Sequence, residues 1–223
     1  MKWGCRMLIA AIVGRDGINE TASLVNSILS TTDQKVSIVD IRNLSGLGAK
    51  RVKSYISELS KNSVDILILK IGCNEACDEV LSSIVFDIII CTDKTDGFDD
   101  NSKAQFPNPI KRALSMLDEK GLVIVNADDS TLMEFLTGLR SPIVTYGFNP
   151  RASITTSSVG DTFFEGKFMC SLQKTICAKN GLTLEPQEYI VKVDSHDTDS
   201  YNVLAAATFA IVNGIDLNHI GHH

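Results

Sequence analysis

Residues 12–21 have the sequence IVGRDGINET and overlap the end of the apolar run MLIAAIV of residues 7–13. An unbroken apolar run of this length predicts a buried strand, and the apolar spacing after Gly17 predicts a helix. A glycine turn between a strand and a helix can bind phosphate through backbone N–H groups at the positive helix end. The bare pattern of Gly14 and Gly17 is equally consistent with a simple strand-to-helix turn.

The loop has the spacing of a phosphate-binding turn without its usual side chains. In such loops a lysine neutralises the β and γ phosphates, and the next residue supplies a hydroxyl that holds magnesium. Ile18 and Asn19 occupy these two positions, and Glu20 adds a negative charge. The sequence therefore predicts a phosphate loop in backbone shape only.

Five more apolar runs of strand length follow, separated by segments with helical spacing. The runs are residues 35–41, 64–71, 86–91, 122–127 and 142–147. The helical segments are residues 20–30, 49–61 (just after Gly48), 75–84, 108–121 and 130–139. Unbroken runs indicate strands buried on both faces. Alternating strands and helices predict a three-layer, mostly parallel α/β sheet flanked by helices.

The pattern changes after residue 150 to short alternating segments, with turn signals at Glu165-Gly166 and Asn180-Gly181. This predicts a small antiparallel β flap over residues 151–194. A last helix is predicted over residues 199–214, with Gly214 as its C-terminal cap. Without repeats or a linker, residues 1–223 are expected to form one domain with its parallel core at residues 6–147.

Composition excludes several classes of function. The chain has 223 residues, a formal net charge of −6 and 44% hydrophobic residues, and it lacks a basic stripe that could bind nucleic acid. The run at residues 7–13 is about a third of the length that spans a bilayer, so no membrane segment is expected. The cysteines lie mostly in apolar runs, which predicts reduced thiols in a cytoplasmic protein. They are Cys5, Cys73, Cys77, Cys91, Cys170 and Cys177.

Five segments resemble, in order and spacing, the central ATP-binding domain of the Mur ligases and folylpolyglutamate synthases. GRDGIN (14–19) stands at the family's GTNGKT loop, and ICTDKTDGFDD (90–100) resembles TNLxxDHLDYH. VIVNADDS (123–130) resembles INADDP, and IVTYG (143–147) resembles VITYG. SYNVLAAATFAIVNGI (200–215) resembles the helix FNxxNALAAxAAALxLGI. The resemblance covers nearly the whole chain and implies the same α/β fold with its antiparallel flap.

The resemblance also implies a chemistry, which is ATP-dependent amide formation with magnesium ions and a carbamylated lysine. Lys111 matches that lysine, Asp96 and Asp99 match the two acids of the DHLD segment, and Asn202 matches the asparagine near the adenine. The remaining implied nucleotide contacts are Gly14, Arg15, Asp16, Gly17, Ile18 and Asn19.

Two positions of the implied metal site have changed. Lys70 replaces the glutamate that holds the second magnesium in the family, and Gly97 replaces a histidine ligand. Two like charges 4 Å apart repel by about 4 kcal/mol at an effective dielectric of 20. The family's N-terminal and C-terminal domains are also not expected in this chain. We therefore expect a catalytically degenerate homologue without a cofactor, acting as a binding, regulatory or interaction module.

Several alternatives remain open. The chain could instead be an ATP- and Mg²⁺-dependent ligase of peptidoglycan precursor synthesis, or a subunit of one completed by a partner chain. Lys70 could be an ordinary lysine that reaches solvent. It could also form a metal-free anion site with Arg15, Lys94 and Lys111, for a nucleotide or another anion. The expected macromolecular partner is another protein or a second copy.

Two groups of acidic residues favour structural roles. The loop that contains Asp96, Asp99 and Asp100 has the composition of a solvated turn. Asp128 and Asp129 are predicted to be a helix N-cap and its first-turn acid.

Overall fold

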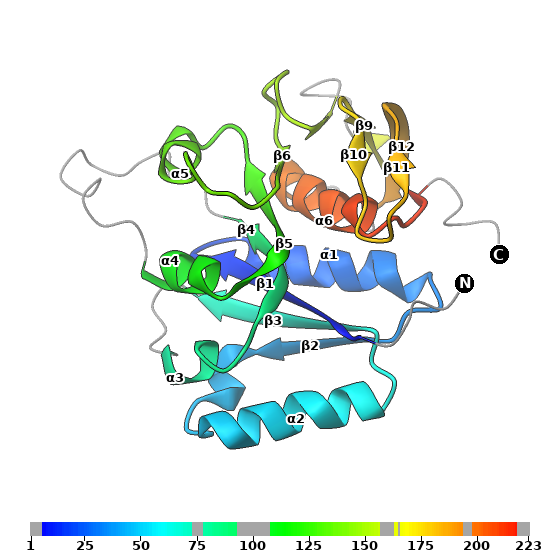
Figure 1. The fold of residues 1–223 in the computed structure, drawn as a ribbon. Coiled ribbons are helices and arrows are strands. Elements are labelled where there is room, and N and C mark those ends of the chain that lie inside the picture. Colours follow the sequence, from blue (N-terminus) through cyan, green and yellow to red (C-terminus); the bar gives the residue numbers. More distant parts are fainter. Residues whose placement is uncertain are drawn as a thin grey trace.

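A mixed sheet runs through the chain in the order β12-β9-β7-β6-β5-β4-β1-β3-β2, with β8 beside β9 (Figure 1). The computed structural model describes residues 6–72, 78–92, 108–156, 163–164, 166–193 and 198–217. The strands of this sheet are β1 (Leu8–Gly14), β2 (Val36–Asp40), β3 (Ile66–Gly72), β4 (Phe86–Cys91), β5 (Leu117–Asn126), β6 (Ile143–Tyr146), β7 (Ile154–Thr155), β8 (Phe163–Phe164), β9 (Lys167–Leu172) and β12 (Gln187–Lys192). A separate small sheet pairs β10 (Ile176–Cys177) with β11 (Thr183–Leu184).

Helices cover both faces of the sheet. They are α1 (Ile18–Ser30), the 3₁₀ helix η1 (Ile41–Leu44), α2 (Ala49–Lys61), α3 (Asp78–Leu81), α4 (Asn108–Ser115), α5 (Ser130–Phe135) and α6 (Ser200–Val212). One buried cluster joins α1 and α6 to the sheet, and a second joins η1, α2, α3, α4 and α5 to the opposite face. The predicted α/β fold class is confirmed, as is the start of α2 after Gly48.

Parallel pairing aligns the strand ends that position the site. Strand β1 lies between β3 and β4, and Ile12 is level with Lys70 on one side and with Ile90 on the other. The same register places Gly14 beside Gly72. Because parallel strands end on the same edge, the loops after β1, β2 and β3 come together there.

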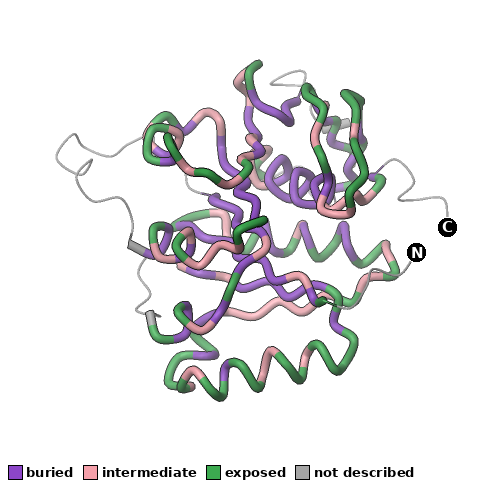
Figure 2. Tube along the Cα trace, viewed as in Figure 1, coloured by how far each residue is buried: buried purple, intermediate pink, exposed green. Residues whose placement is uncertain are grey.

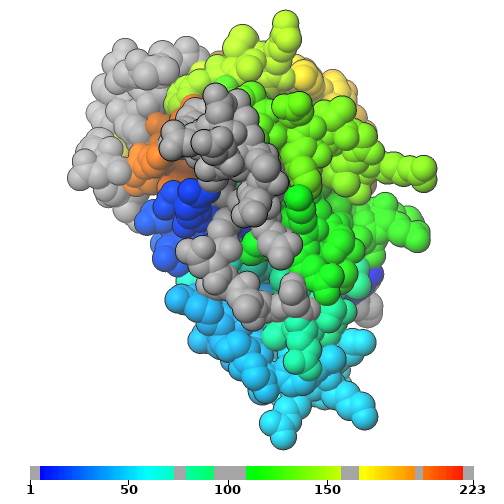
Figure 3. Space-filling view, turned by 90° about the vertical axis from the view of Figure 1, so that its left-hand side faces the viewer, coloured from blue at the N-terminus to red at the C-terminus, as the bar shows by residue number. Residues whose placement is uncertain are grey.

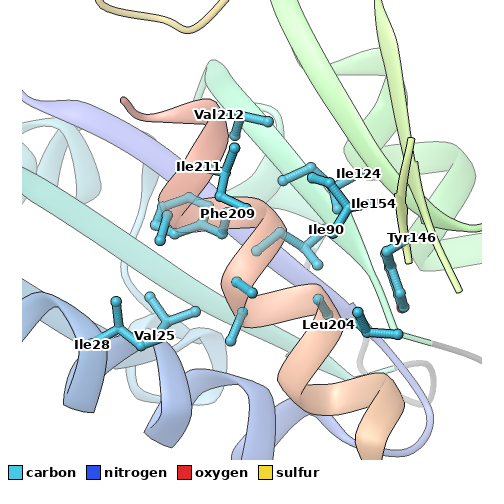
Figure 4. Packing of buried hydrophobic residues seen from close by; sticks show 14 of the residues in the cluster. Val25, Ile28, Ile90, Ile124, Tyr146, Ile154, Leu204, Phe209, Ile211 and Val212 are labelled. Atoms are coloured by element: carbon cyan, nitrogen blue, oxygen red, sulfur yellow. The ribbon is translucent and has the colours of Figure 1, made fainter. Parts of the chain in front are cut away.

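Helix α6 is buried on all sides, as its uniformly apolar sequence requires. Every residue from Val203 to Val212 is buried, and the helix packs against α1, the parallel strands and the antiparallel strands. Figure 4 shows side chains of α6 among those of α1, such as Val25, and those of the sheet, such as Ile124. Figure 2 shows helix α6 as buried. Gly214, with φ of 72°, ends the helix as predicted.

The predicted antiparallel flap continues the main sheet beyond β6. Strand β7 pairs with β6 at Ile154 and Tyr146, and β9 and β12 follow in antiparallel order. Their inward side chains, such as Phe168 and Tyr189, belong to the same buried cluster as α6. Burying this apolar face against α6 makes the antiparallel strands an extension of the sheet.

Some predicted boundaries and burial patterns also differ. The helix expected over residues 108–121 ends at Ser115, because Leu117 pairs with Phe86 as the first residue of β5. The helix expected over residues 130–139 ends at Phe135. Of the segment 75–84, residues 78–81 form α3, and residues 73–77 lie outside the described part.

Strand β2 was predicted to be buried on both faces and is only half-buried. Its residues are all of intermediate exposure, because it is the edge strand beyond β3. Among the described ranges, no helix is both long enough and apolar enough to cross a membrane.

Candidate functional site

A pocket of about 310 Å³ lies at the carboxyl edge of β1, β2 and β3. It is lined by Arg15, Asp16, Gly17, Ile18, Asn19, Glu20, Asp40, Arg42, Lys70 and Gly72. Figure 3 looks onto this edge, where the segment after β1 (blue) reaches the surface next to the start of α6 (orange). The structure thus places the predicted phosphate loop and Lys70 in one site.

The loop keeps the backbone shape of a phosphate-binding turn. Gly17 is the N-cap of α1 with φ of 73°, and no side chain caps the first turn. The hydroxyl of Thr92, just after β4, donates to the Asp16 carbonyl oxygen at 2.7 Å. A residue other than glycine would be strained at position 17, both by the positive φ and by the Asn202 side chain beside it.

Asn202, on α6, contacts this turn. Its Oδ1 accepts a hydrogen bond from the Thr21 hydroxyl at 3.3 Å, and its side chain lies where a Cβ on Gly17 would lie. The predicted contact of Asn202 with a nucleotide stays a prediction, whereas its contact with the loop is direct. Ile18, which replaces the expected lysine, packs its partly buried side chain against the cluster of α1 and α6.

Lys70 is held inside the site. Its Nζ donates to Asn19 Oδ1 at 2.7 Å and lies 3.8 Å from Asp40 Oδ2. Its side chain is 23% exposed, so it does not extend freely into solvent. An ammonium group therefore connects the ends of β2 and β3 to the first turn of α1.

Asp40 and Arg42 belong to the site although neither stood out in the sequence. The Arg42 guanidinium donates twice to Asp40, from Nε to Oδ1 at 2.9 Å and from an Nη to Oδ2 at 2.6 Å, and the Arg42 backbone N–H donates to Oδ1 at 3.0 Å. Hydrogen bonding from Arg42 lowers the pKa of Asp40 to about 2, against the opposing effect of burial, and Lys70 contributes a smaller lowering. A signal was present in the sequence, because Asp40 comes at the carboxyl end of the next strand along the chain after the loop strand, and parallel strands end on the same edge of the sheet.

Among the described residues that line the pocket, the charged side chains balance one another. The three cations are Arg15, Arg42 and Lys70, and the three anions are Asp16, Glu20 and Asp40. A nucleoside triphosphate carries several negative charges and needs a compensating positive field. The lining residues provide no net positive charge for it.

The other predicted site residues are placed differently. Lys111 is exposed on α4, with its Nζ 5.6 Å from the centre of the Phe135 ring, and it is not among the residues that line the pocket. Of the proposed anion cluster, the described residues bring together only Arg15 and Lys70. Lys94, Asp96 and Gly97 lie outside the described residues, as do Asp99 and Asp100.

Within the described ranges, no three His, Cys, Asp or Glu side chains gather in a group that could hold a metal ion. Cys170 is buried, and this burial raises the pKa of its thiol to about 12. It is therefore a packing residue of β9.

Asp128 and Asp129 have other roles than predicted. Asp129 is the N-cap of α5, accepting from the Leu132 backbone N–H at 2.9 Å. Asp128 lies outside the helix and accepts from the backbone N–H groups of Phe148 at 2.6 Å and Asn149 at 2.9 Å. The prediction that Asp128 caps the helix is wrong, because its carboxylate instead binds the loop after β6.

Comparison with known proteins agrees with this fold. No protein-family model matches the chain. A UDP-N-acetylmuramate–L-alanine ligase of Ruthia magnifica subsp. Calyptogena magnifica is 28% identical over 153 residues, which are 67% of this chain and 30% of the ligase.

Solved structures match over almost the whole chain. A UDP-N-acetylmuramoyl-L-alanyl-D-glutamate–2,6-diaminopimelate ligase has a TM-score of 0.67 at 14% identity, over 95% of this chain and 44% of the ligase. The MurF ligase of Thermotoga maritima, in complex with ADP, has a TM-score of 0.61 at 11% identity, over 97% of this chain and 49% of that one.

A folate enzyme has the same fold. The bifunctional folylpolyglutamate synthase/dihydrofolate synthase of Yersinia pestis, with AMPPNP and manganese, has a TM-score of 0.57 at 12% identity, over 95% and 55% of the two chains. This chain thus spans about a third to a half of the length of these proteins. The resemblance predicted from its motifs is confirmed at the level of the fold, which this chain shares with the Mur ligases and the folylpolyglutamate synthases.

Proposed function

We propose that this chain is a Mur ligase homologue that no longer forms amide bonds and acts as a binding module. The observation that supports the proposal most is the hydrogen bond between Lys70 and Asn19 at 2.7 Å. By the motif resemblance, these two residues stand where the family has a glutamate ligand and a magnesium-binding hydroxyl. In this chain an ammonium group bridges the two positions.

The ammonium of Lys70 opposes metal binding as well as removing a ligand. A divalent ion 4 Å from it would be repelled by about 8 kcal/mol at an effective dielectric of 20. The ammonium already has Asn19 and Asp40 as partners, at 2.7 and 3.8 Å. Lys70 thus serves as a built-in monovalent replacement for the metal ion, and the site works without magnesium.

The balanced charge of the pocket also supports this proposal. Arg42 is engaged by Asp40 through two hydrogen bonds, which leaves its charge largely neutralised. A triphosphate would have to compete with Asp40 for both Arg42 and Lys70. A singly charged or neutral ligand, or a protein segment, suits these surroundings better. The link to peptidoglycan precursor synthesis is proposed from the Mur ligase resemblance.

One observation favours the alternative, a ligase that still uses ATP. The left-handed Gly17 and the first turn of α1, which no side chain caps, preserve the geometry that receives phosphates in nucleotide-binding loops. In that case Lys111 would be the carbamylated lysine, and a partner would supply the missing cations.

A direct activity assay separates the two functions. The chain is incubated with ATP and Mg²⁺ together with L-alanine and UDP-N-acetylmuramate, the two compounds in the name of the similar ligase. ADP release and the amide product are then followed by mass spectrometry. We expect neither to exceed the protein-free control. Amide product that disappears in Lys111→Ala would establish the alternative.

A further inference from the structure

Strands β9 and β12 expose one face of their antiparallel ladder. Burial alternates along both strands, so that Phe168, Cys170, Tyr189 and Val191 are buried against α6. The alternate residues form what we call the outer face: Lys167, Met169 and Ser171 on β9, with Glu188, Ile190 and Lys192 on β12. Both strands lie at one end of the sheet (Figure 1).

The centre of the outer face is apolar. Met169 is 40% exposed and Ile190 is 43% exposed, and the two residues are direct cross-strand partners. The described residues include only three other exposed large hydrophobic side chains, Val85, Phe135 and Leu182. Because these two side chains lie directly opposite each other, their exposed apolar surface is contiguous, which is the kind of surface that interaction sites use.

The ends of the outer face have opposite charge. Lys167 and Lys192 are directly opposite each other at one end, a like-charge pair that destabilises an isolated ladder. Glu188 is opposite Ser171 at the other end. From one end to the other, the face is therefore positive, apolar and negative.

We propose that the outer face binds a second copy of this chain around a two-fold axis that runs across the strands. Such an axis reverses the strand direction, so the Met169–Ile190 pair of each copy packs on the same pair of the other. The Lys167–Lys192 pair then faces Glu188 of the second copy, at both ends of the contact. A two-fold contact must be self-complementary, and this order of charges satisfies that condition.

The proposed dimer is a weak one. Stable interfaces bury about 800 Å² on each partner, more than a patch centred on six side chains provides. The electrostatic part acts between exposed charges and is screened by salt. Dimerisation should therefore increase with protein concentration and decrease with ionic strength. The proposed dimer does not involve the pocket that contains Lys70. The dimer proposal can therefore be correct whether or not the proposed function is.

Sedimentation equilibrium over a concentration series up to about 100 µM tests the proposal, because weak dimers assemble in that range. We expect wild type to approach the dimer mass at low salt. Ile190→Lys should be monomeric, and Glu188→Lys should raise the dimer Kd at least about tenfold, because it places like charges against each other.

Two further variants make the test specific. The double change Glu188→Lys with Lys192→Glu restores opposite charges across the axis and should recover dimerisation. Val85→Lys alters an equally exposed residue outside the outer face and should behave as wild type. Circular dichroism checks that each variant is folded. A wild type that stays monomeric throughout the series, or a dimer indifferent to changes at Ile190 and Glu188, overturns the proposal.

Discussion

The ammonium of Lys70 lies 2.7 Å from Oδ1 of Asn19 and joins the end of β3 to the first turn of α1. Both residues depart from the Mur ligase pattern, and the structure shows that the two departures meet. A lysine at position 70 beside an amide at position 19 forms a hydrogen bond where the pattern implies a metal bridge. The residues at positions 19 and 70 therefore depend on each other, because each is the hydrogen-bond partner of the other.

Reversing the charge at position 70 should restore a response to magnesium. Lys70→Glu places a carboxylate near Asp40, and we expect it to lower the free energy of unfolding by about 1–2 kcal/mol. Because the two carboxylates then repel, millimolar Mg²⁺ should raise the melting temperature of this variant. Lys70→Gln is the matched control, expected to be destabilised without responding to Mg²⁺. A wild type stabilised by Mg²⁺ as strongly as Lys70→Glu would contradict this interpretation.

Gly17→Ala tests the turn of the loop. A side chain there meets both the positive φ and the Asn202 side chain, so we expect a loss of about 2 kcal/mol in unfolding free energy. Gly46→Ala is the control, because Gly46 has a similar φ of 81° and no atoms within 4 Å of an added Cβ. It should lose only about 1 kcal/mol.

The Asn202→Ala background separates the two contributions in that experiment. Without the Asn202 side chain, the cost of Gly17→Ala should fall to that of Gly46→Ala. Chemical denaturation measures the free energy of unfolding of wild type, Gly17→Ala, Gly46→Ala, Asn202→Ala and the double variant of Gly17 and Asn202. Equal costs of Gly17→Ala in both backgrounds would show that Asn202 does not restrict this position.

Asp128 should be important for stability although it is not in the pocket. Its carboxylate accepts from the backbone N–H groups of Phe148 and Asn149 and so anchors the loop after β6. Because both are charge-assisted bonds, Asp128→Ala is expected to cost about 2 kcal/mol in unfolding free energy. Glu119→Ala, at an exposed position in β5, should cost less than about 0.5 kcal/mol. Comparable urea midpoints for the two variants would argue against this role.

The pair of Asp40 and Arg42 predicts a pH dependence in acid. The pKa of Asp40 is lowered from 3.8 to about 2, chiefly by the hydrogen bond from Arg42. A lowered carboxyl pKa stabilises the folded state above the unfolded pKa, and this stabilisation is lost as the pH falls through the folded pKa.

Arg42→Gln provides the comparison for this pH dependence. The difference in unfolding free energy between wild type and variant should be constant above about pH 4 and decrease toward pH 2. NMR titration of the Asp40 carboxyl carbon should show its pKa shifted back toward the ordinary value in the variant. A difference that does not change with pH would mean that Arg42 does not set this pKa.

Much of the fold could be predicted from the sequence, because its parallel strands are unbroken apolar runs. The start of α2 after Gly48 and the left-handed Gly214 that follows the end of α6 were predictable from local backbone preferences. Contacts between residues far apart in the sequence could not be predicted from these local patterns. The pairing of Leu117 with Phe86 ends α4 early, and the packing of Phe168 on α6 joins the flap to the sheet.

The site was predictable only where a motif pointed to it. The loop and Lys70 were found through their place in the Mur ligase pattern, and they do line one pocket. Asp40 and Arg42 were missed because an Asp-x-Arg at a strand end has many structural uses. Lys111 was placed near the phosphates by counting along the motif, whereas its contact with Phe135 depends on how α4 and α5 pack.

Isothermal titration with ATP in the presence and absence of Mg²⁺ measures whether this site works without magnesium. The triple variant Ile18→Lys, Asn19→Thr and Lys70→Glu, which restores the family's residues, is the positive control. We predict no magnesium-dependent heat for wild type and magnesium-dependent binding for the triple variant. Binding of ATP by wild type that requires Mg²⁺ would show that the metal site is intact and would favour an active ligase.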